Sequence, residues 1–166
     1  PDRAMRAAIA MHTELAAWNR KRAGEGRKPV KMSVGLNTDV VVSGNIGSPR
    51  RMDYTVIGDG VNLASRLEGA NKAFGTAILC GDATRAATGG AFAWRTVDLL
   101  RVKGKQTGVP VHELVGRSAD VAPADRDRIA RWEAAHARFR ERRFDEARAA
   151  FAALAAERTD DALAAL

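Results

Sequence analysis

The sequence predicts an α+β domain followed by a helical hairpin. Apolar residues recur at spacings of three and four in some stretches, which is the pattern of an amphipathic helix. Other stretches are short, apolar and β-branched, which is typical of strands. The two kinds of segment mix without a strict strand–helix alternation, and this favours an α+β sandwich of ferredoxin-like type. After Gly116 the composition shifts to alanine and arginine with helical spacing.

The first segment has the pattern of an amphipathic helix, with apolar residues at Ala4, Ala8, Met11, Leu15 and Trp18. Because this pattern is already under way at Pro1, we expect the chain to be a fragment of a longer protein, with a domain that is incomplete at its N-terminus. Residues 19–29 are polar and basic and contain glycine, which predicts a surface connection.

Short extended segments follow this connection. The pattern predicts strands at 30–36 and 40–43 joined by a turn at 37–39, then a loop at 44–49 and a strand at 54–57. The sequence GDG at 58–60 breaks the last strand, and Asp59 suits the N-cap of the helix that follows. Helical spacing then continues to about Phe74, where Gly75 ends it.

The rest of the chain divides at Gly116. Before it, we expect a strand at 77–80, a short helix at 82–88 and strands at 92–100 and 109–115. Residues 117–125 have the composition of a linker, so the sequence predicts a domain over 1–116 and a helical tail over 126–166. Two apolar stripes in the tail predict a helical hairpin. This pair resembles a single tetratricopeptide-type repeat, and the alternative is a two-helix extension packed on the domain or on a partner.

Composition narrows the functional classes. The chain has 166 residues, of which 46% are hydrophobic, so a buried core is expected. The formal net charge of +7 favours anionic partners such as nucleotide phosphates, nucleic acid or acidic lipid. The single cysteine, Cys80, excludes a disulfide within the chain and a cysteine-based zinc site. The sequence has no apolar run of transmembrane length and no signal-peptide pattern, so we expect a soluble, cytoplasmic fragment.

The segment 44–68, GNIGSPRRMDYTVIGDGVNLASRLE, carries the densest set of polar residues, whereas the sequence lacks the P-loop, GxGxxG, GxSxG and HExxH motifs. Asn62 and Arg66 are four residues apart in this segment and therefore lie on one face of the predicted helix. An amide beside a guanidinium can hold a sugar oxygen and a phosphate oxygen together. An exposed helix with a solvated arginine would show the same spacing.

Three segments identify a family resemblance: GLNTDVVVSGNIGS, RRMDYTVIGDGVNLASRLEG and RVKGKQTGVPVHEL. They closely resemble the C-terminal two-thirds of a class III nucleotidyl cyclase catalytic domain, and the resemblance extends over residues 1–116. It implies a ferredoxin-like α+β fold. It also implies conversion of ATP or GTP into the 3′,5′-cyclic nucleotide and pyrophosphate, in head-to-tail homodimers with active sites at the interface.

Five residues match functional positions of that family. Asn62 matches the asparagine that positions the ribose, and Arg66 matches the arginine that stabilises the transition state. Lys103 matches the lysine that reaches the triphosphate, and Arg50 matches another phosphate contact. Thr55 occupies the position that reads the purine. Threonine there is typical of a subgroup of mostly bacterial adenylate cyclases, so the resemblance favours ATP as the substrate.

The resemblance also implies groups that lie outside this sequence. The two aspartates that bind two Mg²⁺ or Mn²⁺ ions correspond to positions before Pro1, as does the lysine that partners the base-reading residue. We therefore expect adenylate cyclase activity in the parent protein, which an upstream region could tether to a membrane, and no activity from the fragment alone. Asp39 stands where many members carry glycine.

Two alternatives remain at this point. The chain could be a non-catalytic nucleotide-binding or dimerisation module descended from such cyclases, or it could belong to a guanylate cyclase. The net charge alone would also allow a nucleic-acid binder, but only 5% of the residues are aromatic and no aromatic-rich sheet motif supports it. We therefore expect no nucleic-acid partner, and no direct membrane contact by this fragment.

Overall fold

The computed structural model describes residues 1–48, 51–100, 108–158, 161 and 163. The helices are α1 (Asp2–Gly24), α2 (Asp59–Phe74), α3 (Asp82–Ala86), the 3₁₀ turn η1 (Gly89–Ala91), α4 (Pro123–Arg140) and α5 (Phe144–Glu157). The strands are β1 (Val34–Leu36), β2 (Val42–Ser48), β3 (Arg51–Ile57), β4 (Ile78–Gly81), β5 (Phe92–Leu100) and β6 (Val109–Arg117). The predicted α+β class with a helical hairpin is confirmed.

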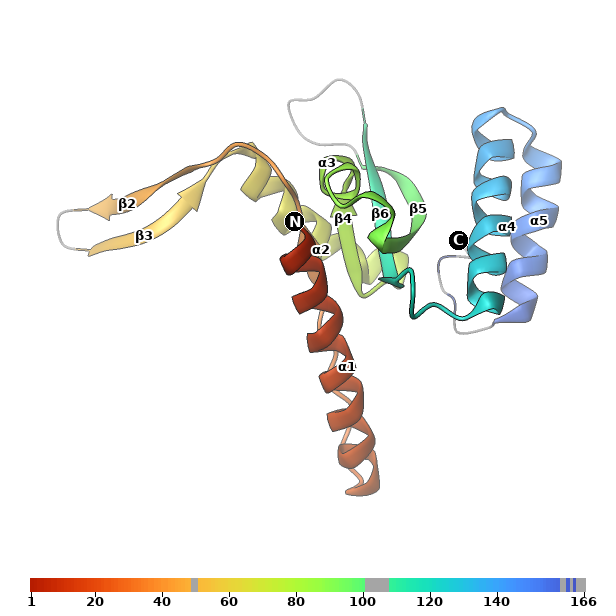
Figure 1. Cartoon of the computed structure of the whole chain (residues 1–166), viewed down its shortest axis with the longest axis horizontal. Helices are drawn as coiled ribbons and strands as arrows, with labels where there is room; N and C mark the ends of the chain where they lie inside the picture. The colour runs from red at the N-terminus through yellow and green to blue at the C-terminus, as the bar shows by residue number, and fades with distance from the viewer. Residues whose placement is uncertain (49–50, 101–107, 159–160, 162, 164–166) are drawn as a thin grey trace.

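The strands form two separate sheets. A four-stranded sheet has the order β1-β4-β6-β5, in which β1 pairs with β4 in parallel and the other neighbours are antiparallel. Strands β2 and β3 form an antiparallel pair of their own, in register from Val42↔Ile57 to Ser48↔Arg51. We call this pair the arm, because it extends away from the sheet (Figure 1).

Two apolar clusters cover the sheet on opposite faces. Successive residues of β4 alternate between them, as the pleat of a strand requires. Leu79 joins a cluster with Leu63 and Leu67 of α2, and all three are buried. Ile78 and Cys80 join the other cluster, which includes Met5 of α1. Helix α2 is thereby fixed against one face of the sheet, and the first turns of α1 against the other.

Several strand predictions were wrong in their bounds and pairing. The predicted strand at 30–36 is a strand only from Val34. The expected turn at 37–39 does not join two paired strands, because β1 pairs with β4 and not with β2. Within the expected loop at 44–49, residues 44–48 belong to strand β2. The backbone pairing of β2 with β3 overrides the low strand propensity of its glycines and asparagine.

Helix α2 begins and ends close to the predicted residues, but Asp59 is not its N-cap. The N-cap is Gly58, with φ 146° and ψ 171°, a backbone conformation that is essentially restricted to glycine. The Asp59 carboxylate lies instead in the first turn, where it suits the helix dipole. At the other end Gly75 adopts the left-handed conformation expected of a glycine that terminates a helix.

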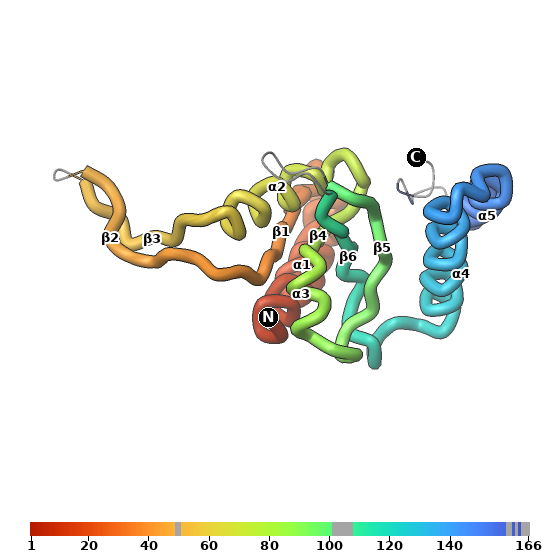
Figure 2. Tube along the Cα trace, turned by 90° about the horizontal axis from the view of Figure 1, so that it is seen from above, coloured from red at the N-terminus to blue at the C-terminus, as the bar shows by residue number. Residues whose placement is uncertain are grey.

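The helix pair α4–α5 packs beside β5, at the sheet edge opposite β1 (Figures 1 and 2). Trp132 of α4 is buried and contacts the ring of Phe151 of α5 at a centroid distance of 4.8 Å. Its indole Nε1 donates to the carbonyl oxygen of Thr96 at 2.6 Å, and the Thr96 amide donates to Glu133 at 2.6 Å. The tail thus covers the backbone of an edge strand, which would otherwise offer unpaired groups.

Candidate functional site

Helix α2 presents two of the predicted site residues to solvent. Leu63 and Leu67 lie on its buried side, while Asn62 and Arg66 are exposed. A spacing of four residues places both polar side chains on the same face. Arg66 has no ion-pair partner among the residues that the structure describes. The two side chains are therefore available to an external ligand.

A third predicted site residue, Thr55, lies on the arm. Thr55 is exposed on β3 and lies directly opposite Gly44 of β2 in the antiparallel register. Because Gly44 has no side chain, no side chain lies directly opposite the Thr55 hydroxyl across the arm. No hydrogen bond joins Thr55 to Asn62 or Arg66 within the described residues. The structure therefore places Thr55 on a neighbouring element, with no hydrogen bond to the pair on α2 among the described residues.

The remaining two predicted site residues, Arg50 and Lys103, lie outside the described residues. In the sequence, Arg50 falls between β2 and β3, and Lys103 falls between β5 and β6.

Two residues that sequence reasoning missed hold α2 against β1. Gly35 of β1 lies so close to α2 that a Cβ there would overlap the backbone of Ala64 and Glu68. Asn71 is 1% exposed, and its Nδ2 donates to the carbonyl of Val34 at 3.0 Å. The sequence offered one signal: Asn71 continues the four-residue spacing of Leu63 and Leu67, so a polar group was due to be buried there.

A cavity of about 450 Å³ lies next to the first turns of α2. Apolar side chains from the start of α1, from the arm and the residue before it, and from α2 line most of it, including Met5, Val41, Val56, Val61 and Ala64. Such a lining suits an apolar segment and does not suit a triphosphate.

The described residues do not fit a metal centre. No three His, Cys, Asp or Glu side chains in the described ranges gather at one point. Cys80 is buried, and burial raises the pKa of its thiol to about 12, so it is a poor nucleophile and a poor metal ligand. A two-metal clamp needs several carboxylates around the reacting oxygens, and the described residues around Asn62 do not supply that set.

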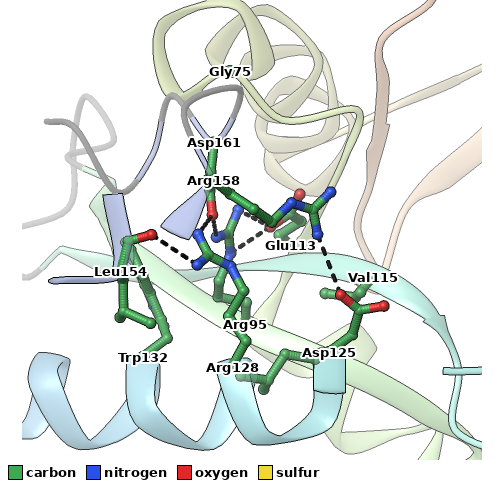
Figure 3. Close-up of a pocket in the computed structure, with 11 residues that line it drawn as sticks. Gly75, Arg95, Glu113, Val115, Asp125, Arg128, Trp132, Leu154, Arg158 and Asp161 are labelled. Carbon is green, nitrogen blue, oxygen red and sulfur yellow. Dashed lines mark hydrogen bonds and ion pairs between the residues drawn. The ribbon is translucent and has the colours of Figure 1, made fainter. Parts of the chain in front are cut away.

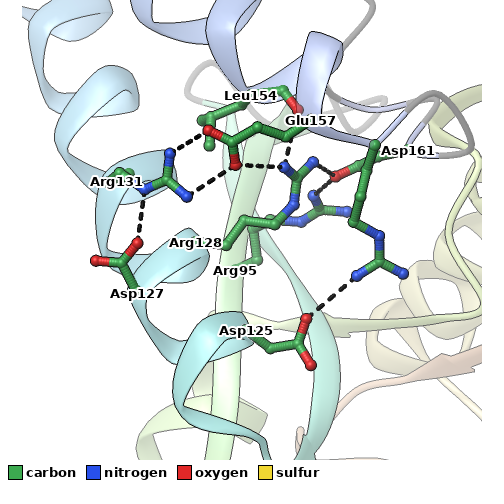
Figure 4. A network of polar contacts seen from close by, with 9 residues as sticks. Arg95, Asp125, Asp127, Arg128, Arg131, Leu154, Glu157 and Asp161 are labelled. Atoms are coloured by element: carbon green, nitrogen blue, oxygen red, sulfur yellow. Dashed lines mark hydrogen bonds and ion pairs between the residues drawn. The ribbon is translucent and has the colours of Figure 1, made fainter.

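A second, smaller cavity of about 220 Å³ lies between the sheet and the helix pair (Figure 3). Its charged groups are paired with one another. Asp161 accepts from Arg95 at 2.6 Å and from Arg128 at 2.5 Å, and Glu113 pairs with Arg95 at 2.6 Å. Figure 4 shows the ion pairs continuing to Arg131 and Glu157 at the rim. These contacts make the cavity a structural junction rather than a substrate site.

The pKa values of two carboxylic acids at this junction, Asp161 and Glu113, are shifted in opposite directions. Burial raises the pKa of Asp161, but the hydrogen bonds from Arg95 and Arg128 outweigh burial, so the pKa is lowered overall. For Glu113 burial dominates over the charge of Arg95, and its pKa is raised. Asp161 is therefore the firmly ionised carboxylate that holds the two arginines together.

Comparison with known proteins decides the family. Residues 2–114 match the family described as the adenylate and guanylate cyclase catalytic domain. The chain belongs to this family. It is 35% identical over 115 residues to adenylate cyclase 1 of Rhizobium meliloti, which covers 69% of this chain and 17% of that protein. It is 34% identical over 120 residues to the adenylate cyclase of Anabaena cylindrica, covering 68% of this chain and 24% of that protein. The chain thus spans a quarter or less of these relatives.

Solved structures of cyclases agree with the fold. The adenylyl cyclase CyaB from P. aeruginosa superposes with a TM-score of 0.58 at 30% identity, covering 69% of this chain and 58% of that chain. The guanylyl cyclase Cya2 superposes with a TM-score of 0.56 at 33% identity, covering 70% of this chain and 60% of that one. In the part of the chain that the structure describes, no helix combines the length and apolarity needed to span a membrane.

Proposed function

We propose that this cyclase domain contributes one half of each active site in a homodimeric adenylate cyclase, which converts ATP into 3′,5′-cyclic AMP and pyrophosphate in the cytoplasm. The main observation that supports this proposal is the exposed Asn62–Arg66 pair on α2, in a chain of the cyclase family. Relatives named adenylate cyclase support the choice of reaction.

In the proposed reaction the ribose 3′-oxygen attacks the α-phosphorus. A new phosphorus–oxygen bond closes the ring, the bond to the pyrophosphate oxygen breaks, and the proton of the 3′-hydroxyl is released. The Asn62 amide binds the ribose and holds its hydroxyl in line. The Arg66 guanidinium stabilises the negative charge that builds on the α-phosphate oxygens. Divalent metal use is a property that we assign to the parent protein, through carboxylates outside this chain.

Three further residues complete the proposed nucleotide contacts. Thr55 reads the edge of adenine with its hydroxyl, which is both a donor and an acceptor. Lys103 and Arg50 bind the phosphates as cations. The similarity to the guanylyl cyclase Cya2 supports a second candidate reaction, cyclisation of GTP. Rates of cyclic nucleotide formation by the purified longer protein with ATP and with GTP would distinguish the two.

The homodimer is supported by the arm. Its apolar side chains Met52, Tyr54, Val56 and Ile57 are exposed by 43% or more, and they occur on both faces of the two-stranded ribbon. An isolated ribbon of this kind is marginally stable in water, so a partner surface is expected to cover it.

A non-catalytic nucleotide-binding or dimerisation module is the alternative function. The exposed Asn62–Arg66 pair and the exposed apolar side chains of the arm would serve such a module as well. The sequence before Pro1 separates the two proposals, because two aspartates at the metal positions favour the enzyme and their absence favours the module.

Complementation tests the proposed enzyme. The 166-residue chain should produce no detectable cyclic AMP from Mg-ATP or Mn-ATP. In the longer protein, an Arg66→Ala subunit should be rescued by a subunit that lacks the metal aspartates, since the mixed dimer keeps one intact site. Arg66→Ala homodimers are the control. Absence of rescue in mixed dimers that demonstrably form would contradict the composite site, as would robust activity of the chain alone that Arg66→Ala abolishes.

A further inference from the structure

The residues that follow β1 contact two helices, although Thr38 and Asp39 remain exposed to solvent. Asn37 Nδ2 donates to the carbonyl oxygen of Gly60, in the first turn of α2, at 3.2 Å. The next residue, Thr38, accepts a hydrogen bond from Thr84 of α3 at 3.1 Å, and Thr84 is 1% exposed. The segment is therefore a contact point between the sheet and the start of the helix that carries the site.

Asp39 and Gly60 have complementary sizes. A Cβ built at Gly60 would overlap the side chain of Asp39, so the first turn of α2 approaches Asp39 as only glycine allows. The Asp39 carboxylate is itself held, since its Oδ1 accepts from the backbone amide of Val40 at 2.8 Å. Asp39, itself exposed, thus occupies the space that a side chain at Gly60 would need.

The first turn of α2 has little else to fix it. No side chain caps the helix, and the amides of Val61 and Asn62 both donate to the same carbonyl, that of Gly58, at 3.2 Å. The middle and the end of α2 are held by the contacts of Gly35 and Asn71 described above. Before Leu63 enters the core, the contacts that reach Gly60 therefore help to hold the first turn and, with it, Asn62.

We propose that Asn37 and Asp39 are positioning residues for the cyclase reaction: by holding the first turn of α2 at Gly60, they set the direction of the Asn62 and Arg66 side chains. This inference rests on the proposed function, because the orientation of the two side chains matters only if they act on a nucleotide. A misplacement of about 1 Å at a reacting group can lower a rate by about 100-fold. Neither residue needs to touch the nucleotide.

A compensating pair of substitutions at positions 39 and 60 tests the size complementarity. Gly60→Ala would ordinarily stabilise a helix, but here the added methyl meets Asp39. In the longer protein, Gly60→Ala should lower kcat by about tenfold to a hundredfold with a smaller change in KM for ATP. In the Asp39→Gly/Gly60→Ala double variant, loss of the Asp39 side chain makes room for the new methyl group, and most of kcat should recover. A double variant as impaired as Gly60→Ala alone would overturn the proposal.

Asn37→Asp tests the hydrogen bond, because the change keeps the shape of the side chain and removes the donor to Gly60. The matched control is Asn19→Asp, since Asn19 Nδ2 donates in the same way to the carbonyl of Val30 at 2.8 Å, at the far end of α1. Both variants should lose some thermal stability, but only Asn37→Asp should lower kcat, by about tenfold. Equal kcat in the two variants would overturn the role of Asn37.

A measurement on the 166-residue chain separates failure of this inference from failure of the proposed function. Hydrogen exchange at the amides of Val61 and Asn62 should become faster in Asn37→Asp and in Gly60→Ala, and should be unchanged in Asn19→Asp. If the longer protein makes no cyclic nucleotide, the proposed function fails, while faster exchange still supports the anchoring of α2. If exchange is unchanged, the positioning role fails even in an active enzyme.

Discussion

The arginine of α2, Arg66, and the arginines of the tail junction show two different uses of the same side chain. Arg66 is exposed on α2 without an ion-pair partner among the described residues. Arg95 and Arg128 have side-chain exposures of 12% and 11%, and both bind Asp161. A guanidinium that the fold already satisfies has a structural role, whereas one held on a rigid helix and left open is available to a ligand. The difference separates the site from the scaffold even though both are rich in charge.

The buried arginines of the junction find their partners on several elements at once. The Arg95 guanidinium lies over the ring of Trp132 at 4.8 Å while it pairs with Glu113 and Asp161. A buried charge that keeps its partners is tolerated, but removing one partner leaves an expensive unpaired charge. We therefore expect the junction to govern stability and the α2 face to govern chemistry. The following predictions test this division.

Trp132→Ala carries the largest expected effect. Trp132 is 4% exposed and joins α4 to Phe151 and to Thr96, so its loss should lower the free energy of unfolding by about 3–5 kcal/mol. Urea denaturation followed by circular dichroism measures this change. Trp18→Ala is the control, because Trp18 is 48% exposed and should change stability by about 1 kcal/mol or less. Equal effects of the two substitutions would show that the helix pair does not fold with the sheet.

Arg66→Ala should lower the activity and leave the stability nearly unchanged, the reverse of Trp132→Ala. Removing a preorganised cation from a developing charge should lower kcat by about 10²–10³-fold, equivalent to about 2.7–4 kcal/mol, in the longer protein. The KM for ATP should change much less, since the contact strengthens in the transition state. The unfolding free energy of the chain should stay within about 0.5 kcal/mol of wild type because the side chain is exposed. A large loss of stability with unchanged kcat would place Arg66 with the scaffold.

Features that depend on local sequence signals could be predicted, whereas features that depend on pairing between distant segments could not. Helix α2 was predictable because Leu63 and Leu67 mark its buried side and Gly75 marks its end, and these signals are local. The arm was not, because Gly44 and Gly47 have the composition of a loop and form a strand only through pairing with β3. The hydrogen bonds of Trp132 and Glu133 to Thr96 also depend on which strand lies at the sheet edge, and no local pattern contains that information.

The smallest predicted effect concerns His112 and pH. His112 is 3% exposed on β6, between α3 and β5. Its Nδ1 lies 3.1 Å from the Nη1 of Arg85, which can only donate, so Nδ1 accepts and the proton sits on Nε2, facing Asp82 at 3.0 Å. A second proton would have to be placed on Nδ1, against Arg85. Burial lowers the pKa of His112, and the charge of Arg85 lowers it further against the opposing pull of Asp82.

The sign of the pH dependence follows from this lowered pKa. The unfolded chain binds the proton near the ordinary pKa of about 6.5 and the native chain binds it only at lower pH, so the stability is complete above pH 6.5 and is lost as the pH falls below it. The slope from one such histidine is at most about 1.4 kcal/mol per pH unit. Urea midpoints at pH 7.5, 6.5 and 5.5 measure it. His12 and His136 have pKa values lowered by burial too, so His112→Gln should make the dependence shallower without removing it. An unchanged slope in His112→Gln would contradict the assignment.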